Sequence, residues 1–373
     1  MDTPIKVLMT TDAVGGVWTY ALDLAAGLRE SGIEITLAIL GPRPSGGQRQ
    51  AAARIAGLRV LETGLPLDWT AGSRDEVVGA GAALAALAAE TGCDLVHLNS
   101  PALAADAAFP CPVIAACHSC VATWWAAVRG GSLPEDFAWR TDLVRSGYEA
   151  ADLLLAPSAA FARATADAYA LRELPRVAHN GRAARPAPSP REPAGRCFVL
   201  TAGRLWDEGK NIAALDRVAQ KLPAPVLAAG PTHGPNGAVI ALHHAAALGY
   251  VDAATLDGHF AARPVFASLA FYEPFGLAVL EAAQAGCPLV LSDIPTFREL
   301  WDEAALFVHP KDENGAVAIL TGLLADATER DRLGRAAQER AGRYRLDRMV
   351  EGVAGAYRDV LASKGRPHLM TAA

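Results

Sequence analysis

Short runs of apolar residues alternate along this chain with longer stretches in which apolar residues recur every three or four positions. The short runs are typical of buried strands, and the longer stretches have the periodicity of amphipathic helices. This alternation predicts β-α-β units and therefore parallel sheets. We predict the first helix at residues 17–30. The predicted strands cover residues 5–10, 34–40, 94–98, 113–116, 197–202, 226–229, 265–269 and 289–291.

The pattern is interrupted at residues 185–195, where four prolines in eleven residues exclude a helix or a central strand. We interpret this segment as a linker between an N-terminal Rossmann-like domain at 1–184 and a C-terminal one at 196–345. The remaining region, 346–373, begins with a predicted helix at about 346–363, which we expect to pack back towards the N-terminal domain. The predicted fold class is α/β, with two doubly wound parallel-sheet domains.

Composition narrows the classes of function. The chain has 373 residues, 51% of them hydrophobic, which is more than one core usually holds. A net charge of -6 indicates that the protein lacks the basic surface that nucleic-acid binding requires. No signal peptide and no transmembrane segment is predicted, because no apolar run approaches about 18 residues. We therefore expect a cytoplasmic protein that does not bind nucleic acid.

Six cysteines in a chain of this length are too few for a disulfide scaffold and fit reduced thiols. Cys117 and Cys120 form a Cys-x-x-Cys pair, which can be a redox pair or half of a zinc site. A zinc site needs a second pair of ligands, and Cys111 is the only further thiol nearby. We interpret the pair as small, half-buried thiols at the end of a strand.

Ligands of open parallel sheets bind beyond the carboxyl ends of the strands. Gly15 and Gly16 follow the first strand, where glycine allows close backbone approach or positive φ and a helix N-terminus favours an anion. An ordinary strand-to-helix turn explains this pair about equally well. In the second domain, Arg204 and Lys210 lie between a strand and a helix, where they can neutralise a diphosphate. The alternative is a pair of solvated surface cations.

Two glutamates, Glu273 and Glu281, lie eight positions apart around a Pro-Phe-Gly turn. We expect a helix to start at Pro274, so that the backbone N–H groups of residues 275–277 are unpaired at its positive end. Eight residues span about 2.2 turns, which places both carboxylates near one face. One carboxylate can then accept hydrogen bonds from ribose hydroxyls while the other faces the transferred group.

Together these motifs resemble the family-4 (group 1) retaining glycosyltransferases of GT-B fold. The specific part is Glu273-x7-Glu281 within Glu-Pro-Phe-Gly-Leu. Supporting parts are the Gly203-Arg204-Leu205 loop with Lys210, the Gly15-Gly16 loop, His118 after a strand, and Asn180-Gly181. The resemblance extends from the first strand through Glu299. It implies two Rossmann-like domains facing each other across a cleft, with the nucleotide sugar mainly on the second domain and the acceptor mostly on the first.

The resemblance also implies roles. His118, Glu273, Arg204 and Lys210 form the catalytic set. Arg204 and Lys210 stabilise the diphosphate, Glu281 binds the ribose, and His118 lies by the reacting sugar, although a buried core histidine is the alternative. The donor sugar and distal phosphate contact Glu273 and the backbone of Phe275, Gly276 and Leu277, and Gly15 and Gly16 approach the diphosphate.

Trp124 and Trp125 can stack on the acceptor, although at least one is expected to be packing. One departure is the order Gly209-Lys210-Asn211, where the family has Lys-Gly.

The implied reaction is transfer of a hexose from a nucleoside-diphosphate sugar to a hydroxyl with retention, the departing phosphate serving as base. The acceptor is a saccharide, a lipid-linked or a small molecule. No cofactor is expected, and no metal, because no Asp-x-Asp pair is present. A glycosidase would need carboxylates on facing walls, and a nicotinamide oxidoreductase would need a dinucleotide fingerprint that the first loop lacks. A nucleotide-sugar epimerase and a non-catalytic nucleotide-sugar-binding scaffold remain as alternatives.

Overall fold

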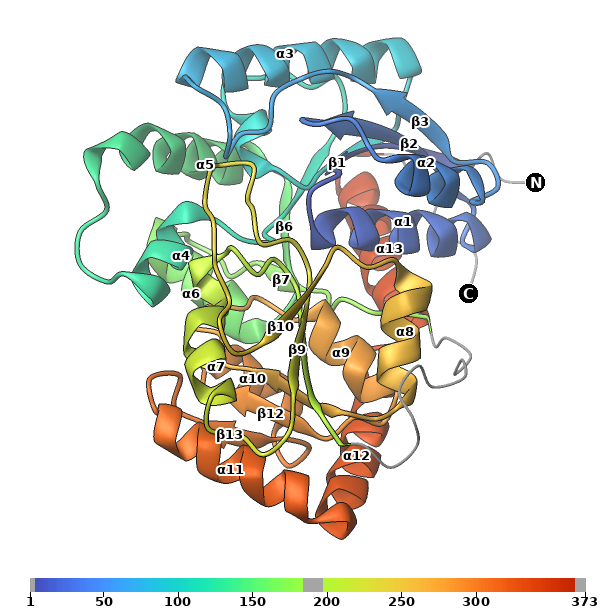
Figure 1. The fold of residues 1–373 in the computed structure, drawn as a ribbon. Coiled ribbons are helices and arrows are strands. Elements are labelled where there is room, and N and C mark those ends of the chain that lie inside the picture. Colours follow the sequence, from blue (N-terminus) through green and yellow to red (C-terminus); the bar gives the residue numbers. More distant parts are fainter. Residues whose placement is uncertain (1–3, 184–196, 366–373) are drawn as a thin grey trace. The chain divides into compact units, whose positions relative to one another are not determined.

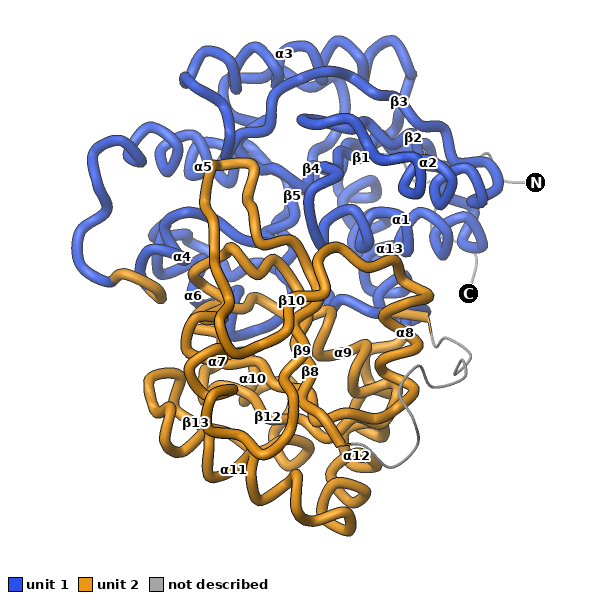
Figure 2. Tube along the Cα trace, viewed as in Figure 1, with its two compact units in different colours: residues 1–126, 130–181, 346–373 blue, residues 127–129, 182–345 orange. Residues whose placement is uncertain are grey.

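The computed structural model describes residues 4–183 and 197–365, which form two compact units, each built on one parallel β-sheet (Figure 1). Unit 1 comprises residues 1–126, 130–181 and 346–373, and unit 2 comprises 127–129 and 182–345 (Figure 2). The predicted linker, 185–195, lies outside the described residues.

Unit 1 contains a seven-stranded sheet in the order β3-β2-β1-β4-β5-β6-β7, with all pairs parallel. The order reverses between β1 and β4, as in a doubly wound fold. The strands are β1 (Ile5–Asp12), β2 (Ile33–Leu40), β3 (Arg59–Glu62), β4 (Leu95–Leu98), β5 (Val113–Ala116), β6 (Leu153–Ala156) and β7 (Arg176–Val177). The helices that follow them are α1 (Gly16–Glu30), α2 (Gly46–Ala53), α3 (Arg74–Thr91), α4 (Val121–Val128), α5 (Ala138–Ala150) and α6 (Ala159–Tyr169).

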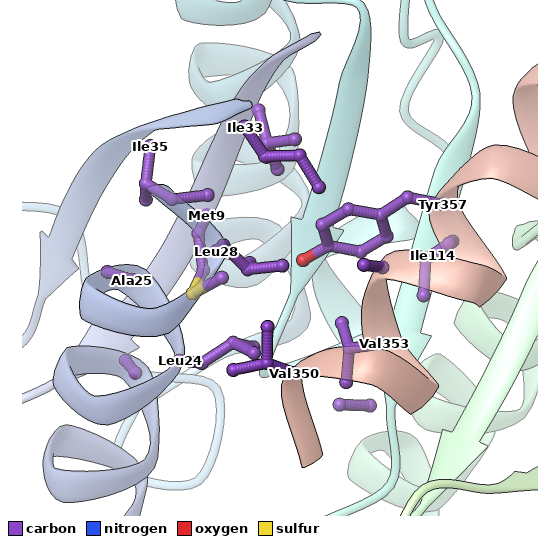
Figure 3. Close-up of a cluster of buried hydrophobic side chains, with 14 of the residues drawn as sticks. Met9, Leu24, Ala25, Leu28, Ile33, Ile35, Ile114, Val350, Val353 and Tyr357 are labelled. Atoms are coloured by element: carbon purple, nitrogen blue, oxygen red, sulfur yellow. The ribbon is translucent and has the colours of Figure 1, made fainter. Parts of the chain in front are cut away.

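The last helix, α13 (Leu346–Ser363), packs into the core of unit 1. Figure 3 shows Val350 and Tyr357 of this helix gathered with Leu24 and Leu28 of α1 and with residues of the sheet. The two helices approach closely at Gly27, where an added Cβ would lie 2.3 Å from Cγ2 of Val350. A residue without a side chain is therefore needed at this crossing. The apolar positions of the predicted helix at 346–363 thus form the face of α13 that is buried against α1.

Unit 2 contains a six-stranded sheet in the order β10-β9-β8-β11-β12-β13, also fully parallel, and its order reverses between β8 and β11. The strands are β8 (Val199–Ala202), β9 (Val226–Ala229), β10 (Ala246–Gly249), β11 (Val265–Ser268), β12 (Leu289–Ser292) and β13 (Leu306–Val308). The helices are α7 (Ile212–Ala219), α8 (Ala253–Ala261), α9 (Leu277–Gln284), α10 (Pro295–Trp301), α11 (Glu313–Ala325) and α12 (Ala327–Ala341).

Two parallel-sheet α/β domains are therefore confirmed. The sequence pattern missed five strands, and four of them, β3, β7, β10 and β13, are the edge strands of the two sheets. Both residues of β7 are exposed, and β3 begins with Arg59 and ends with Glu62, so neither strand has a continuous apolar run. β13 is apolar, but it is only three residues long. In the part of the chain that the structure describes, no helix is long and apolar enough to cross a membrane.

Candidate functional site

The predicted donor-side residues lie in unit 2, in the loops after β8 and β11, where the strand order reverses. Ligands of doubly wound sheets bind at such a reversal, because the loops there diverge and leave room between them. The two loops are tied together through one carbonyl: the backbone N–H groups of Phe271 and Tyr272 donate to the Gly209 oxygen at 2.9 and 3.2 Å. The fold therefore brings segments about sixty residues apart in sequence into one site.

The loop after β8 is organised by Asp207, which is 7% exposed. Its Oδ2 accepts a hydrogen bond from Nη2 of Arg204 at 2.9 Å, and its Oδ1 accepts one from the backbone N–H of Gly209 at 2.9 Å. The Arg204 guanidinium also lies 5.5 Å from the ring centroid of Trp206. Arg204 is thus oriented from two sides, while about a third of its side chain stays exposed. Sequence reasoning did not single out Asp207, although its position three residues after the arginine was a usable signal.

Asn211 anchors the same loop at its far end. It adopts φ of 54°, a left-handed conformation that asparagine tolerates better than most residues. Its Nδ2 donates to the backbone oxygens of Leu269 and Pro310, both at 2.9 Å. These bonds connect the loop to the segments that follow β11 and β13. Asn211 was also not predicted as a functional residue, and its side chain fixes the end of the loop directly after Lys210.

Lys210 and Glu273 form the central ion pair of this site. The distance from Nζ of Lys210 to Oε2 of Glu273 is 2.5 Å, and 19% and 15% of the two side chains are exposed. One residue comes from the loop after β8 and the other from the loop after β11. The reversed order Gly209-Lys210-Asn211 therefore still delivers the ammonium group to the second loop.

The expectation of a helix starting at Pro274 is wrong, since α9 begins at Leu277. Gly276 has φ of 93°, a conformation that no right-handed helix contains and that favours glycine. Phe275 is only 3% exposed, and its ring packs edge-on against Tyr344 at 5.7 Å between centroids. The N–H groups at the positive end of α9 thus start at Leu277, and the side chain of Phe275 packs in the core. A donor contact by the backbone of Phe275 and Gly276 remains a prediction. No side chain in the described residues caps this end.

The expectation that both glutamates share one helix face is also wrong. Glu273 lies ahead of α9, and Glu281 lies within it. Oε1 of Glu281 is 2.7 Å from Nη2 of Arg182, and both side chains are mostly buried, with 9% of Arg182 and 14% of Glu281 exposed. Arg182 directly follows the Asn180-Gly181 pair that carried part of the resemblance. Each glutamate is therefore neutralised by a different cation, which sequence spacing alone did not indicate.

In unit 1 the predicted residues follow β1, at the reversal between β1 and β4. Gly15 precedes α1 with φ of −152°, which is extended backbone, and Gly16 is the first residue of the helix. Positive φ therefore does not explain Gly15, and close approach of another group remains a prediction. The turn is held by Asp12, whose Oδ1 accepts a hydrogen bond from the Val14 N–H at 2.7 Å. No side chain of the described residues caps α1.

His118 follows β5 and contacts the loop after β4. Asn99 donates through Nδ2 to the Thr10 oxygen at 2.6 Å, so its Oδ1 faces His118 and accepts from Nε2 at 2.7 Å. This network assigns the proton of the neutral imidazole to Nε2 and leaves Nδ1 as an acceptor. Burial lowers the pKa of His118 to about 4, so the ring is neutral at pH 7. The Tyr20 ring contacts it edge-on at 4.6 Å between centroids.

Trp124 and Trp125 lie on α4, and both are partly exposed. The centroid of the Trp125 ring lies 5.8 Å from that of the Phe137 ring, and the centroids of the two tryptophan rings are 6.4 Å apart. Trp125 therefore has a packing partner within unit 1. The acceptor-side role of both residues remains a prediction.

Comparison with known proteins decides the family. Residues 14–183 match the model described as Glycosyltransferase Family 4, and residues 239–340 match the model described as Glycosyl transferases group 1. This chain belongs to the group 1 glycosyltransferases of GT-B fold. It is 36% identical to the O-antigen chain mannosyltransferase B of Escherichia coli over 84 residues, a match that covers 22% of each protein. The aligned part is thus about a fifth of that relative.

Solved structures of other glycosyltransferases share the fold over nearly the whole chain. Sucrose-phosphate synthase from Thermosynechococcus elongatus superimposes with a TM-score of 0.78 at 18% identity, covering 96% of this chain and 100% of that one. Anabaena Alr3699/HepE, solved in complex with UDP and glucose, superimposes with a TM-score of 0.73 at 19% identity. The match covers 95% of this chain and 99% of that one. At such identities the likeness establishes the fold and no more.

The residues of unit 2 that were predicted to bind the donor present cations and backbone N–H groups. Within residues 4–183 and 197–365, no group of three or more His, Cys, Asp and Glu residues is arranged to hold a metal ion. Arg204 and Lys210 instead supply positive charge at the carboxyl end of the unit 2 sheet, next to loops that also carry their carboxylate partners. Such preoriented cations can bind a diphosphate without first being ordered by it.

Proposed function

We propose that this chain is a retaining glycosyltransferase that moves a hexose from a nucleoside-diphosphate sugar to a hydroxyl acceptor without a metal ion. The observation that carries the proposal is the Lys210–Glu273 ion pair at 2.5 Å, formed where the unit 2 strand order reverses. The likeness to a structure solved with UDP and glucose supports a nucleotide-sugar donor. We assign the activity to the cytoplasm as part of the same proposal.

On the donor side, cleavage of the anomeric C–O bond develops negative charge on the departing diphosphate. Arg204, Lys210 and the start of α9 at Leu277 stabilise that charge, while Glu273 orients Lys210 and faces the donor sugar. Charges held in place before the reaction cost no reorganisation in the transition state. Glu281, held by Arg182, accepts hydrogen bonds from the ribose hydroxyls.

On the acceptor side, His118 contributes as a neutral hydrogen-bonding group. Its Nε2–H is occupied by Asn99, so Nδ1 accepts a hydrogen bond from a hydroxyl of the reacting sugar. The departing phosphate takes the proton of the acceptor hydroxyl as the new glycosidic bond forms on the same face, which retains configuration. Gly15 and Gly16 offer a further backbone contact to the diphosphate, and Trp124 or Trp125 stacks on a saccharide or apolar acceptor.

The first experiment is thermal unfolding of the full-length protein with UDP-, GDP- and ADP-sugars in the presence of EDTA. A ligand at a hundred times its Kd stabilises the native state by about 2.7 kcal/mol. We expect stabilisation by one nucleotide class, lost in Lys210→Met and retained in Lys221→Met, which removes an exposed lysine of the same unit. If none of the nucleotide sugars stabilises the protein, the proposal is contradicted.

Turnover then separates the alternatives. With the stabilising donor and an array of sugar and small-molecule acceptors, NMR of the product should show the anomeric configuration of the donor retained. Lys210→Met and Glu273→Gln should each lower kcat about 100-fold to 1000-fold, the usual loss for one preorganised contact to developing charge. Donor interconversion without an acceptor would identify an epimerase, and binding without turnover would identify a scaffold.

A further inference from the structure

Cys93 and Cys111 are eighteen residues apart in sequence, yet their sulfur atoms are 3.6 Å apart in unit 1. Cys93 comes just after α3 and before β4, and Cys111 comes just before β5. β4 and β5 are parallel neighbours with Val96 opposite Val113. The segments that lead into these two strands therefore lie side by side at the same edge of the sheet. The sheet topology itself brings these thiols together.

The separation fits a disulfide geometrically. Neighbouring strands lie about 4.8 Å apart, and disulfides join residues whose Cα atoms are about 4.4–6.8 Å apart. The sulfurs must close from 3.6 Å to a bond of about 2.05 Å, which rotation of the two side chains can supply. Both residues are partly exposed, so a small oxidant can reach them.

The two thiols are chemically unequal. The hydrogen bond from Cys111 outweighs the effect of burial and lowers the pKa of Cys93 to about 7, so much of Cys93 is thiolate at pH 8. Cys117, from the Cys-x-x-Cys motif, is the opposite case, because burial raises its pKa to about 12. Burial thus disfavours the thiolate of Cys117 in the motif that the sequence suggested, whereas the thiolate of Cys93 is favoured by a neighbour that only the fold reveals.

We propose that Cys93 and Cys111 form a redox-active dithiol that is converted to a disulfide by a low-molecular-weight disulfide such as oxidised glutathione. The Cys93 thiolate attacks one sulfur of glutathione disulfide, breaks its S–S bond and releases one glutathione thiolate. Cys111 then loses its proton and attacks the Cys93 sulfur, releasing the second glutathione. Two protein thiols are oxidised to one disulfide, and one glutathione disulfide is reduced to two thiols.

The test uses the reduced full-length protein, incubated anaerobically at pH 8 in glutathione buffers of increasing oxidised fraction, then alkylated and mapped without reduction. We expect a peptide cross-linked through Cys93 and Cys111. The intact mass of a sample taken before alkylation should be lower by two hydrogen atoms. Cys111→Ser should instead hold glutathione at Cys93 as a mixed disulfide. Cys197→Ser, which removes another partly exposed thiol, should leave the cross-link unchanged.

Two results would overturn the proposal. One is wild-type protein that carries glutathione on both Cys93 and Cys111 without a cross-link at equilibrium. The other is preferential oxidation of another pair, Cys117 with Cys120, while Cys93 stays reduced. Because the readout is the disulfide itself, the outcome does not depend on whether the protein transfers a sugar.

Discussion

The Arg182 guanidinium holds the Glu281 carboxylate at 2.7 Å in a mostly buried ion pair. The backbone of Arg182 is fixed as well: its N–H donates to the Tyr344 oxygen at 3.2 Å, and its oxygen accepts from Nε2 of Gln284 at 3.1 Å. Arg182 is thus anchored both to Gln284, the last residue of the helix that carries Glu281, and to Tyr344, which follows α12. The glutamate proposed to bind ribose therefore has one orientation before any ligand arrives.

Removing Arg182 should be far more costly than removing an exposed arginine. Arg182→Met leaves the Glu281 charge buried without its partner, which typically costs about 3–5 kcal/mol. Arg332→Met breaks an exposed pair with Glu329 and should cost at most about 1 kcal/mol. Urea unfolding measures both. The double variant Arg182→Met with Glu281→Leu should recover much of the loss, and equal costs for the two single variants would disprove the buried pair.

Gly276 should resist replacement by alanine because of its backbone conformation. Its φ of 93° penalises any residue with a Cβ, and the left-handed region costs such a residue about 1–2 kcal/mol. The added Cβ would also lie 3.2 Å from Cγ2 of Val279 and 3.3 Å from the Phe297 ring. Gly322→Ala, within α11 and with no atom near the new Cβ, should instead stabilise the protein by about 0.5–1 kcal/mol. Thermal unfolding of the two variants gives the comparison, and shifts of the same sign would contradict it.

Two histidines of unit 1, the fully buried His97 and the partly buried His118, should make the protein less stable in acid. Burial lowers the pKa of His97 to about 3 and that of His118 to about 4, against about 6.5 in the unfolded chain. Below pH 6.5 the unfolded chain therefore binds protons that the native state does not, and stability falls as the pH is lowered. The slope is about 1.4 kcal/mol per pH unit for each proton.

The contribution of His118 can be isolated by difference. Urea unfolding of wild type and His118→Asn at intervals between pH 7 and pH 4 should show a shallower decline in the variant, because carboxylate titrations are common to both proteins. Parallel curves would show that His118 titrates normally in the native state. Above about pH 7.5, where the histidine of the unfolded chain is also largely deprotonated, the two proteins should show no difference in slope from this source.

Tyr357→Phe should destabilise unit 1 without altering its packing. The Tyr357 hydroxyl lies 2.6 Å from Nδ1 of His97, and both residues are fully buried. Loss of the hydroxyl leaves that ring nitrogen without its partner, at a cost of about 1–3 kcal/mol. Tyr250→Phe, in a residue that is 77% exposed, is the matched control and should be neutral in the same denaturation assay.

Much of the fold was predictable because buried central strands leave a readable signal. The strands predicted at 113–116 and 226–229 coincide with β5 and β9, and the helix predicted at 346–363 coincides with α13. The edge strands β3 and β7 were missed because polar or exposed residues interrupt the apolar run, and β13 because it is only three residues long. The start of α9 was misplaced because Pro274 is a good first helical residue, whereas the left-handed backbone conformation of Gly276 delays the helix to Leu277.

The sequence by itself determined the α/β class, the parallel sheets and the loops in which Arg204, Lys210, Glu273 and His118 lie, because each depends on local periodicity and on strand ends. Only the tertiary structure decided which charges pair. Lys210 meets Glu273 across 63 residues, and Arg182 meets Glu281 across 99, because the strand order reverses between β8 and β11 and the chain after Gly181 returns to α9. Sequence separation carries no record of such contacts, since they arise from the topology of the sheet.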